Sequence, residues 1–212
     1  HVAWQGGEPL LRGIEFFHRS VELAHRHAKP WQRVVHSIQT NGTLVDDEWA
    51  AFFRENGYLV GLSVDGPKAL HDAYRIDKQG RGSFDAVTRA WITLRRHGVD
   101  VNILCSVHAR NADHPLEIYR FLRDTLGAEY LQFIPIVERS SAESSAGSPP
   151  VTDRSVAAGK FGAFLIAIFD EWLRRDVGRV FVISFEAALG SWLGLHHSCV
   201  VAPNCGASPV LM

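Results

Sequence analysis

The chain has 212 residues, 46% of them hydrophobic and 21% charged, which is ordinary for a globular domain with a sizeable core. Its formal net charge of -1 does not favour a protein that binds nucleic acid or a membrane surface. No apolar run reaches the roughly 20 residues that a membrane-spanning helix needs, so we expect a soluble, cytoplasmic protein.

Short β-branched runs alternate with amphipathic segments along most of the chain. Residues 2–4 are expected to end a strand, and Ile14, Phe17 and Val21 have helical spacing in the segment that follows. Further strands are predicted near residues 34–39, 59–63, 101–107 and 130–136. The helices between them are predicted from Asp46 and Ser83 as N-caps, from Pro115 in a first turn, and from Gly57, Gly98 and Gly127 as stops. A last helix is predicted over residues 155–175, after a loop rich in Ser, Ala, Gly and Pro.

This alternation predicts βαβ units and a parallel sheet. The pattern leaves two closures open, a doubly wound sheet or a barrel. In both, functional residues gather where the strands end, at their carboxyl termini.

Three motifs follow successive predicted strands. Gln5-Gly6-Gly7-Glu8 can bring backbone close to a ligand, and Thr40-Asn41-Gly42-Thr43 follows the second strand. Each of these could also be only a tight turn. Ser63 ends the third strand, and Arg75 lies shortly beyond it. A hydroxyl and a guanidinium suit a carboxylate ligand, although Arg75 alone could equally make a surface ion pair.

The three cysteines cannot form a disulfide framework because their number is odd. Cys199 and Cys205 are separated by five residues and lie beside Pro and Gly, so they could serve one metal centre, or be two free thiols. Cys105 falls within a predicted strand and is expected to be a small buried hydrophobic residue.

The order and spacing of these motifs resemble the radical S-adenosylmethionine (SAM) superfamily. Within it, Ser63-Val64-Asp65-Gly66-Pro67 followed by His71 and Arg75, and the closing Cys-x5-Cys-Gly, resemble the anaerobic sulfatase-maturating enzymes. The resemblance implies a partial (β/α)6 barrel. It also implies 4Fe–4S clusters and SAM, which yield a 5′-deoxyadenosyl radical that oxidises a Cys or Ser of a sulfatase peptide to Cα-formylglycine.

The resemblance also implies roles for individual residues. Gln5, Gly6, Gly7, Glu8, Asn41, Ser63, Arg75 and Val137 would contact SAM, and Cys199 and Cys205 would hold an auxiliary cluster of the SPASM type. It further implies a sulfatase peptide as substrate and flavodoxin or ferredoxin as electron donor. The residues divide accordingly into a partial barrel (1–137), a surface loop (138–155), a helical segment (156–198) and the start of a SPASM region (199–212).

The chain departs from the family pattern because it contains no Cys-x3-Cys-x2-Cys. We therefore interpret it as an internal fragment that is itself inactive, with the cluster loop before His1 and the family's catalytic acid after Met212. Two alternatives stay open: another SPASM enzyme that modifies a different peptide, or a barrel remnant that only binds a peptide or nucleotide.

Overall fold

The computed structural model describes residues 1–140 and 151–195. They form one parallel sheet of six strands, paired in the order of the sequence. The strands are β1 (Val2–Trp4), β2 (His36–Thr40), β3 (Tyr58–Ser63), β4 (Asp100–Val107), β5 (Tyr130–Pro135) and β6 (Phe181–Val182). A doubly wound sheet reverses its strand order at a switch point, and the described strands show no such reversal. The sheet is therefore an open, partial barrel, as the resemblance implied.

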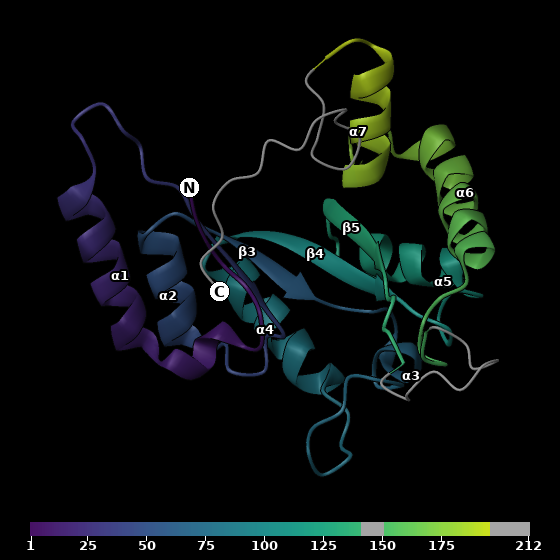
Figure 1. Ribbon diagram of the computed structural model, residues 1–212, viewed down its shortest axis with the longest axis horizontal. Coiled ribbons are helices and arrows are strands. Elements are labelled where there is room, and N and C mark those ends of the chain that lie inside the picture. Colours follow the sequence, from purple (N-terminus) through teal and green to yellow (C-terminus); the bar gives the residue numbers. More distant parts are fainter. Residues whose placement is uncertain (141–150, 196–212) are drawn as a thin grey trace.

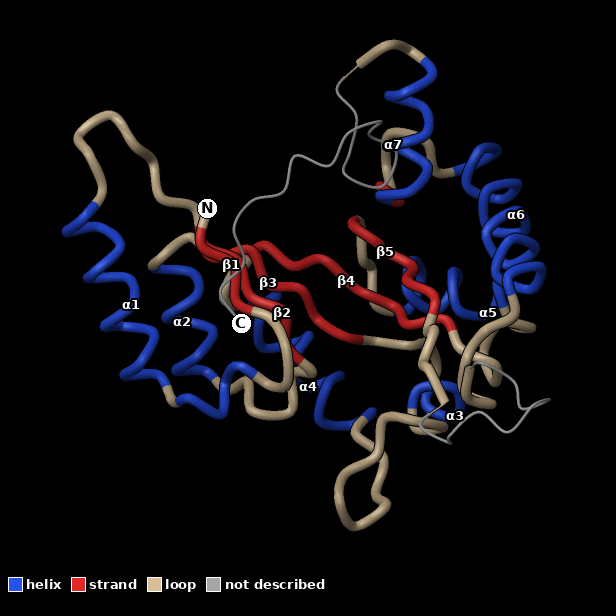
Figure 2. The backbone as a smooth tube through the Cα atoms, viewed as in Figure 1, coloured by secondary structure: helices blue, strands red, loops and turns tan. Residues whose placement is uncertain are grey.

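The helices follow the outer side of the curved sheet, from α1 and α2 on one side to α5 and α6 on the other (Figures 1 and 2). The longer ones are α1 (Ile14–His27), α2 (Asp47–Glu55), α4 (Phe84–Arg96), α6 (Ala158–Arg175) and α7 (Ile183–Trp192). Shorter turns of helix are η1 (Pro9–Arg12), α3 (Lys68–His71), α5 (Pro115–Arg120) and η2 (Phe121–Thr125). No described helix is long and apolar enough to cross a membrane.

Alternation along the strands separates an apolar face from a polar one. In β4, Val101, Ile103, Cys105 and Val107 are buried beneath the helices, whereas Asn102 and Leu104 face the inner side of the sheet. Because β2, β3 and β4 are in register through Gln39, Gly61 and Asn102, these inner residues lie side by side across the strands. The sheet thus presents an inner surface on which uncharged polar side chains lie beside Leu59 and Leu104.

Of two predicted N-cap residues, one caps its helix through its side chain and the other does not. Asp46 caps α2 as predicted, because its carboxylate accepts a hydrogen bond from the Trp49 amide at 3.0 Å. Ser83 stands at the N-cap position of α4, but its hydroxyl donates to the Arg75 carbonyl instead. Asp72 accepts the hydrogen bond of the Phe84 amide in its place.

The strand β6 was not predicted from the sequence. It has only two residues, too few to show a period, and it lies in the segment expected to be helical. Pairing of Tyr130 and Leu131 of β5 with Phe181 and Val182 adds it to the sheet. Residues 156–195, the described part of this segment, therefore supply the last described strand as well as helices.

Candidate functional site

The motifs chosen from the sequence meet at one rim of the sheet. Gly7 follows β1, Asn41 follows β2, Ser63 ends β3 and Val137 follows β5. All the strands are parallel, so these four positions lie at the same, carboxyl-terminal edge. The predicted common rim is confirmed.

The loop after β1 is open above its two glycines. Gly6 and Gly7 have φ angles of 95° and 57°, which L side chains rarely adopt. A Cβ atom on either residue would meet nothing within 4 Å. Glycine is therefore needed here for backbone conformation, and the space above the loop is free for a ligand.

Glu8 connects this loop to the end of β2 through hydrogen bonds. Its carboxylate accepts hydrogen bonds from the Thr40 hydroxyl at 2.8 Å, from the Asn41 amide at 2.8 Å and from the Leu10 amide at 3.1 Å. Asn41 in turn accepts from the Thr43 amide and hydroxyl. Both side chains therefore shape the rim, and the two hydrogen bonds of the Asn41 side chain use its Oδ1 rather than its Nδ2.

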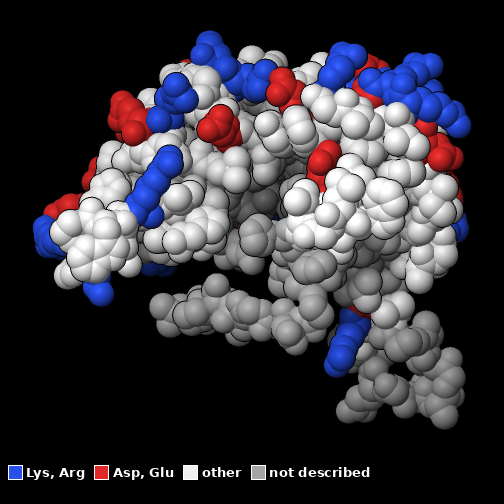
Figure 3. Space-filling model, turned by 90° about the horizontal axis from the view of Figure 1, so that it is seen from above, with Lys and Arg blue, Asp and Glu red and all other residues white. Residues whose placement is uncertain are grey.

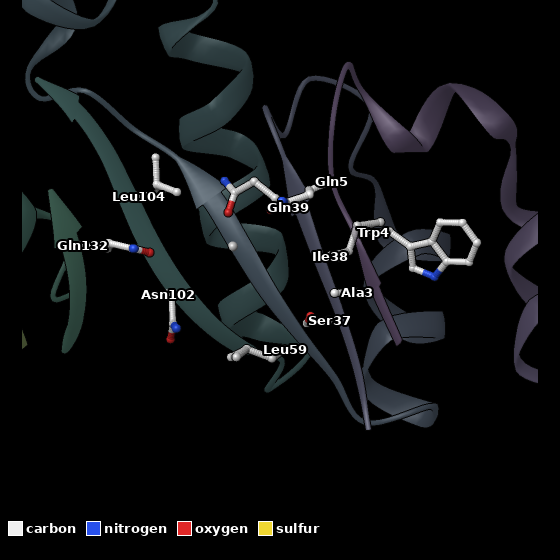
Figure 4. A pocket seen from close by; sticks show the side chains of 11 residues that line it. Ala3, Trp4, Gln5, Ser37, Ile38, Gln39, Leu59, Asn102, Leu104 and Gln132 are labelled. Carbon is white, nitrogen blue, oxygen red and sulfur yellow. The ribbon is translucent and has the colours of Figure 1, made fainter. Parts of the chain in front are cut away.

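A small cavity of about 160 Å³ lies against the inner face of the sheet. Uncharged polar side chains from four different strands or their ends border it, and Figure 4 shows how they are spread across the sheet. They are Gln5, Ser37, Gln39, Asn102 and Gln132. Carboxamides both donate and accept hydrogen bonds, so this surface suits neutral polar groups such as peptide amides better than ions.

Arg75 forms a two-pronged ion pair with Asp65. Its Nε donates to Asp65 Oδ2 at 2.5 Å and its Nη2 donates to Asp65 Oδ1 at 3.0 Å. The Asp65 side chain is 3% exposed and the Arg75 side chain 23% exposed. The pair is therefore not the exposed surface pair that was the alternative for Arg75, and two parallel hydrogen bonds fix the orientation of the guanidinium.

Residues that the sequence did not single out hold this pair in place. The Ser106 amide donates to Asp65 Oδ1 at 2.8 Å, and Arg75 Nη2 donates to the Ser106 hydroxyl at 3.1 Å. Asn111 donates to the carbonyls of Ser106 and Asp65 at 2.9 and 3.3 Å. Asp65 was part of a recognised motif, but only the fold brings β4 and the loop after it against that motif.

Two histidines are buried around the pair without charge. The His71 ring accepts from the Asp65 amide at 3.2 Å, and burial lowers the pKa of His71 to about 4. Burial also lowers the pKa of His108, whose Nε2 has no hydrogen-bond partner among the described residues. Neutral rings avoid adding positive charge beside Arg75.

A second cavity of about 240 Å³ opens at this end of the rim. It is bordered by Asp65, Tyr74, Arg75, Ser106, His108, Ile136 and Arg154. Arg154 lies over the Tyr74 ring at 4.9 Å from its centre. The cavity thus joins a charged side, an aromatic ring and the apolar Ile136, and Val137 next to Ile136 is 67% exposed and free to make a contact.

These features test whether SAM could fit at the rim. An amino acid carboxylate needs donors, and the Ser63 hydroxyl and Arg75 Nη1 are available, since the other two Arg75 nitrogens donate to Asp65 and Ser106. A purine needs apolar contact, for which Ile136 and Val137 offer surface. The open glycine loop offers backbone groups to the amino end. The donor set and the free space therefore fit SAM.

The described residues do not fit an iron–sulfur cluster. Cys105 is fully buried in β4, as predicted, and burial raises the pKa of its thiol far above the usual range. No three His, Cys, Asp or Glu side chains in residues 1–140 and 151–195 are grouped so as to hold a metal ion. Cys199 and Cys205 lie outside the described residues, so their predicted ligation stays a prediction.

A group of basic side chains lies away from the rim. Figure 3 shows it at the upper right, on the side of the molecule where α5 and α6 lie. Arg120 of α5 and Arg123 of η2 pair with the carboxylate of Glu171, and Arg123 also pairs with Asp176 at 2.7 Å. These pairs join α5 and η2 to α6 and to Asp176, which follows it, so we assign them to stability.

The fold is a partial barrel, an open parallel sheet in sequence order with a glycine loop, a serine and an arginine near its carboxyl-terminal rim. The profile of the Radical SAM superfamily matches residues 1–122, more than half of the chain. The chain belongs to the radical SAM superfamily.

Among curated proteins, the chain is similar to anaerobic sulfatase-maturating enzymes. A serine-type anaerobic sulfatase-maturating enzyme of Bacteroides thetaiotaomicron is 40% identical over 98% of this chain and 52% of the relative. A cysteine-type enzyme of Clostridium perfringens is 37% identical over 96% of this chain and 54% of the relative. The chain thus spans about half the length of these relatives.

Solved structures agree with the sequence relatives. "Native anSMEcpe with bound AdoMet" superposes with a TM-score of 0.83 at 36% identity, over 93% of this chain and 53% of that one. "Native anSMEcpe with bound AdoMet and Kp18Cys peptide" gives a TM-score of 0.82 at the same identity. The fold of this chain is therefore that of one half of these proteins.

Proposed function

We propose that the full-length protein is a radical SAM enzyme of the anaerobic sulfatase-maturating type, which oxidises a Cys or Ser of a sulfatase peptide to Cα-formylglycine. The observation that carries the proposal is the carboxyl-terminal edge of the sheet, along which the open glycine loop, Ser63 and the Asp65-held Arg75 all lie. The 40% identity to a serine-type enzyme and the 37% identity to a cysteine-type enzyme support the reaction.

In this proposal SAM lies along the rim from β1 to β5. Backbone groups of Gln5, Gly6 and Gly7 contact its amino end, shaped by the Glu8 and Asn41 hydrogen bonds. Ser63 and Arg75 hold its carboxylate and ribose, and Val137 covers the adenine. Bound SAM would supply the radical that abstracts hydrogen, and the residues named here orient it.

The neutral inner face supports a peptide substrate. The cavity bordered by Gln39, Asn102 and Gln132 offers paired donors and acceptors, which match the N–H and C=O groups of an extended peptide. A solved relative carries a bound peptide together with AdoMet. We further propose Cys199 and Cys205 as ligands of an auxiliary cluster, flavodoxin or ferredoxin as the electron donor, and a cytoplasmic location.

The test is turnover by the full-length protein after anaerobic cluster reconstitution. Matched sulfatase peptides with Ser, Cys or Ala at the target position are incubated with SAM and a reductant. We expect release of 5′-deoxyadenosine and, for the seryl peptide, a mass decrease equal to two hydrogen atoms. SAM cleavage without any change in either the seryl or the cysteinyl peptide would instead favour an enzyme that modifies another peptide. Absence of SAM binding would leave only the binding-module alternative.

A further inference from the structure

The side chain of Gln39 crosses a neighbouring strand instead of lying over its own. Gln39 is in β2, yet its carboxamide reaches over β3, as the close view of the cavity shows (Figure 4). It ends at Ser63, where Gln39 Nε2 donates to the Ser63 hydroxyl at 3.1 Å. This side chain therefore links the inner face of the sheet to the rim.

The crossing is possible only because β3 has a glycine beneath it. A Cβ atom on Gly61 would lie 2.0 Å from Gln39 Oε1 and 2.9 Å from Gln39 Cδ, far inside contact distance. Gly61 does not have a positive φ angle, so its backbone conformation is open to other residues. The structure thus explains this glycine by the space that Gln39 occupies.

The hydrogen bond from Gln39 decides what the Ser63 hydroxyl can do. A hydroxyl has one donor hydrogen and two acceptor lone pairs. When its oxygen accepts from Gln39, its hydrogen is free to point elsewhere. Among the described residues this is the one hydrogen bond of the Ser63 side chain, which is 8% exposed at the end of β3. Ser63 is thereby prepared to donate to an acceptor at the rim.

We propose that Gln39, lying on Gly61, is a positioning residue that holds Ser63 as a hydrogen-bond donor to the carboxylate of SAM. The inference rests on the proposed function, because it takes SAM as the ligand of the rim. Gln39 itself need not touch SAM. Its effect passes through the orientation of one hydroxyl.

The test measures SAM dissociation constants by anaerobic equilibrium dialysis of the cluster-reconstituted, full-length protein. Gln39→Met keeps the length of the side chain and removes the donor, and it should weaken SAM binding about tenfold, the usual effect of losing one well-placed bond to a charged group. Gln39→Glu can only accept, so it takes the Ser63 hydrogen for itself and should weaken binding more than Gln39→Met. Gln79→Ala, on an exposed loop, is the control and should bind SAM as the wild type does.

Two double variants separate positioning from a general loss of structure. Gly61→Ala should weaken SAM binding in the wild type but change it less than about twofold in Gln39→Ala, because the obstructed side chain is then absent. In the same way, Gln39→Met should have no further effect in Ser63→Ala. A merely structural role would instead make the single effects add.

The outcomes distinguish this inference from the proposed function. If the wild type binds no SAM, the proposed function fails and the inference fails with it. If the wild type binds SAM and Gln39→Met binds it equally well, the inference alone is wrong. Additive effects of Gly61→Ala and Gln39→Ala would also overturn it, since they would show that the glycine serves something other than Gln39.

Discussion

Replacing Arg75 by lysine conserves the charge but should weaken the hydrogen bonds that hold Asp65 and Ser106 in place at the rim. Arg75 makes three hydrogen bonds, two to Asp65 and one to Ser106, from two nitrogens of a planar fork. Lysine has one nitrogen, so we expect it to keep one bond to Asp65. The lost bond to a carboxylate is worth about 1.5–3 kcal/mol and the lost bond to a hydroxyl about 1 kcal/mol. Because Arg75 is 23% exposed, we reduce the total to about 2 kcal/mol.

The lost stabilisation of Asp65 can be measured by hydrogen exchange at a single backbone amide, that of Ser106. The Ser106 N–H donates to Asp65 Oδ1, so a mobile Asp65 leaves that amide open to exchange. Protection of Ser106 from hydrogen exchange should fall about thirtyfold in Arg75→Lys, as 2 kcal/mol implies. The matched control is Arg81→Lys, whose partner Asp77 is on the surface and whose side chain is 73% exposed, and it should leave Ser106 unchanged. Equal protection of Ser106 in wild type and Arg75→Lys would refute the reasoning.

Three further predictions concern the glycines, a buried histidine and the cysteine pair. Gly7→Ala should lower the free energy of unfolding by about 1 kcal/mol, because only its φ angle is unfavourable for alanine. Gly42→Ala should lower it more, because its Cβ would also lie 2.6 Å from Leu62 Cδ1. Urea unfolding of both variants compares these losses, and equal losses would contradict the predicted clash. Burial lowers the pKa of His71 to about 4, so the unfolded chain takes up a proton at this residue more readily than the folded protein does. The contribution of His71 to the free energy of unfolding is therefore fully present above pH 6.5 and falls by about 3 kcal/mol as the pH falls toward 4. The free energy of unfolding measured across that range should be less acid-sensitive in His71→Gln. Cys205→Ala should lower bound iron after reconstitution but not SAM affinity, and unchanged iron content would exclude Cys205 as a ligand.

The sequence alone determined the layered fold and the positions of the motifs. Alternating strand and helix periods require βαβ units, and parallel strands bring every loop that follows a strand to one edge. Gly7, Asn41, Ser63 and Val137 were therefore placed at a common rim by topology, without any knowledge of side-chain contacts. Local signals were also sufficient for Asp46, because an N-cap bonds to an amide only three residues away.

Only the tertiary structure decided which partners those residues have. The bonds of Asp65 to Ser106, of Glu8 to Asn41 and of Gln39 to Ser63 span 41, 33 and 24 residues, and no local pattern encodes them. From the sequence, Arg75 could belong either to an exposed surface ion pair or to the site. Its burial beside Asp65 showed that the ion pair is not an exposed one. The strand β6 was missed for the same reason, because two residues become a strand only when the edge of β5 is there to pair with them.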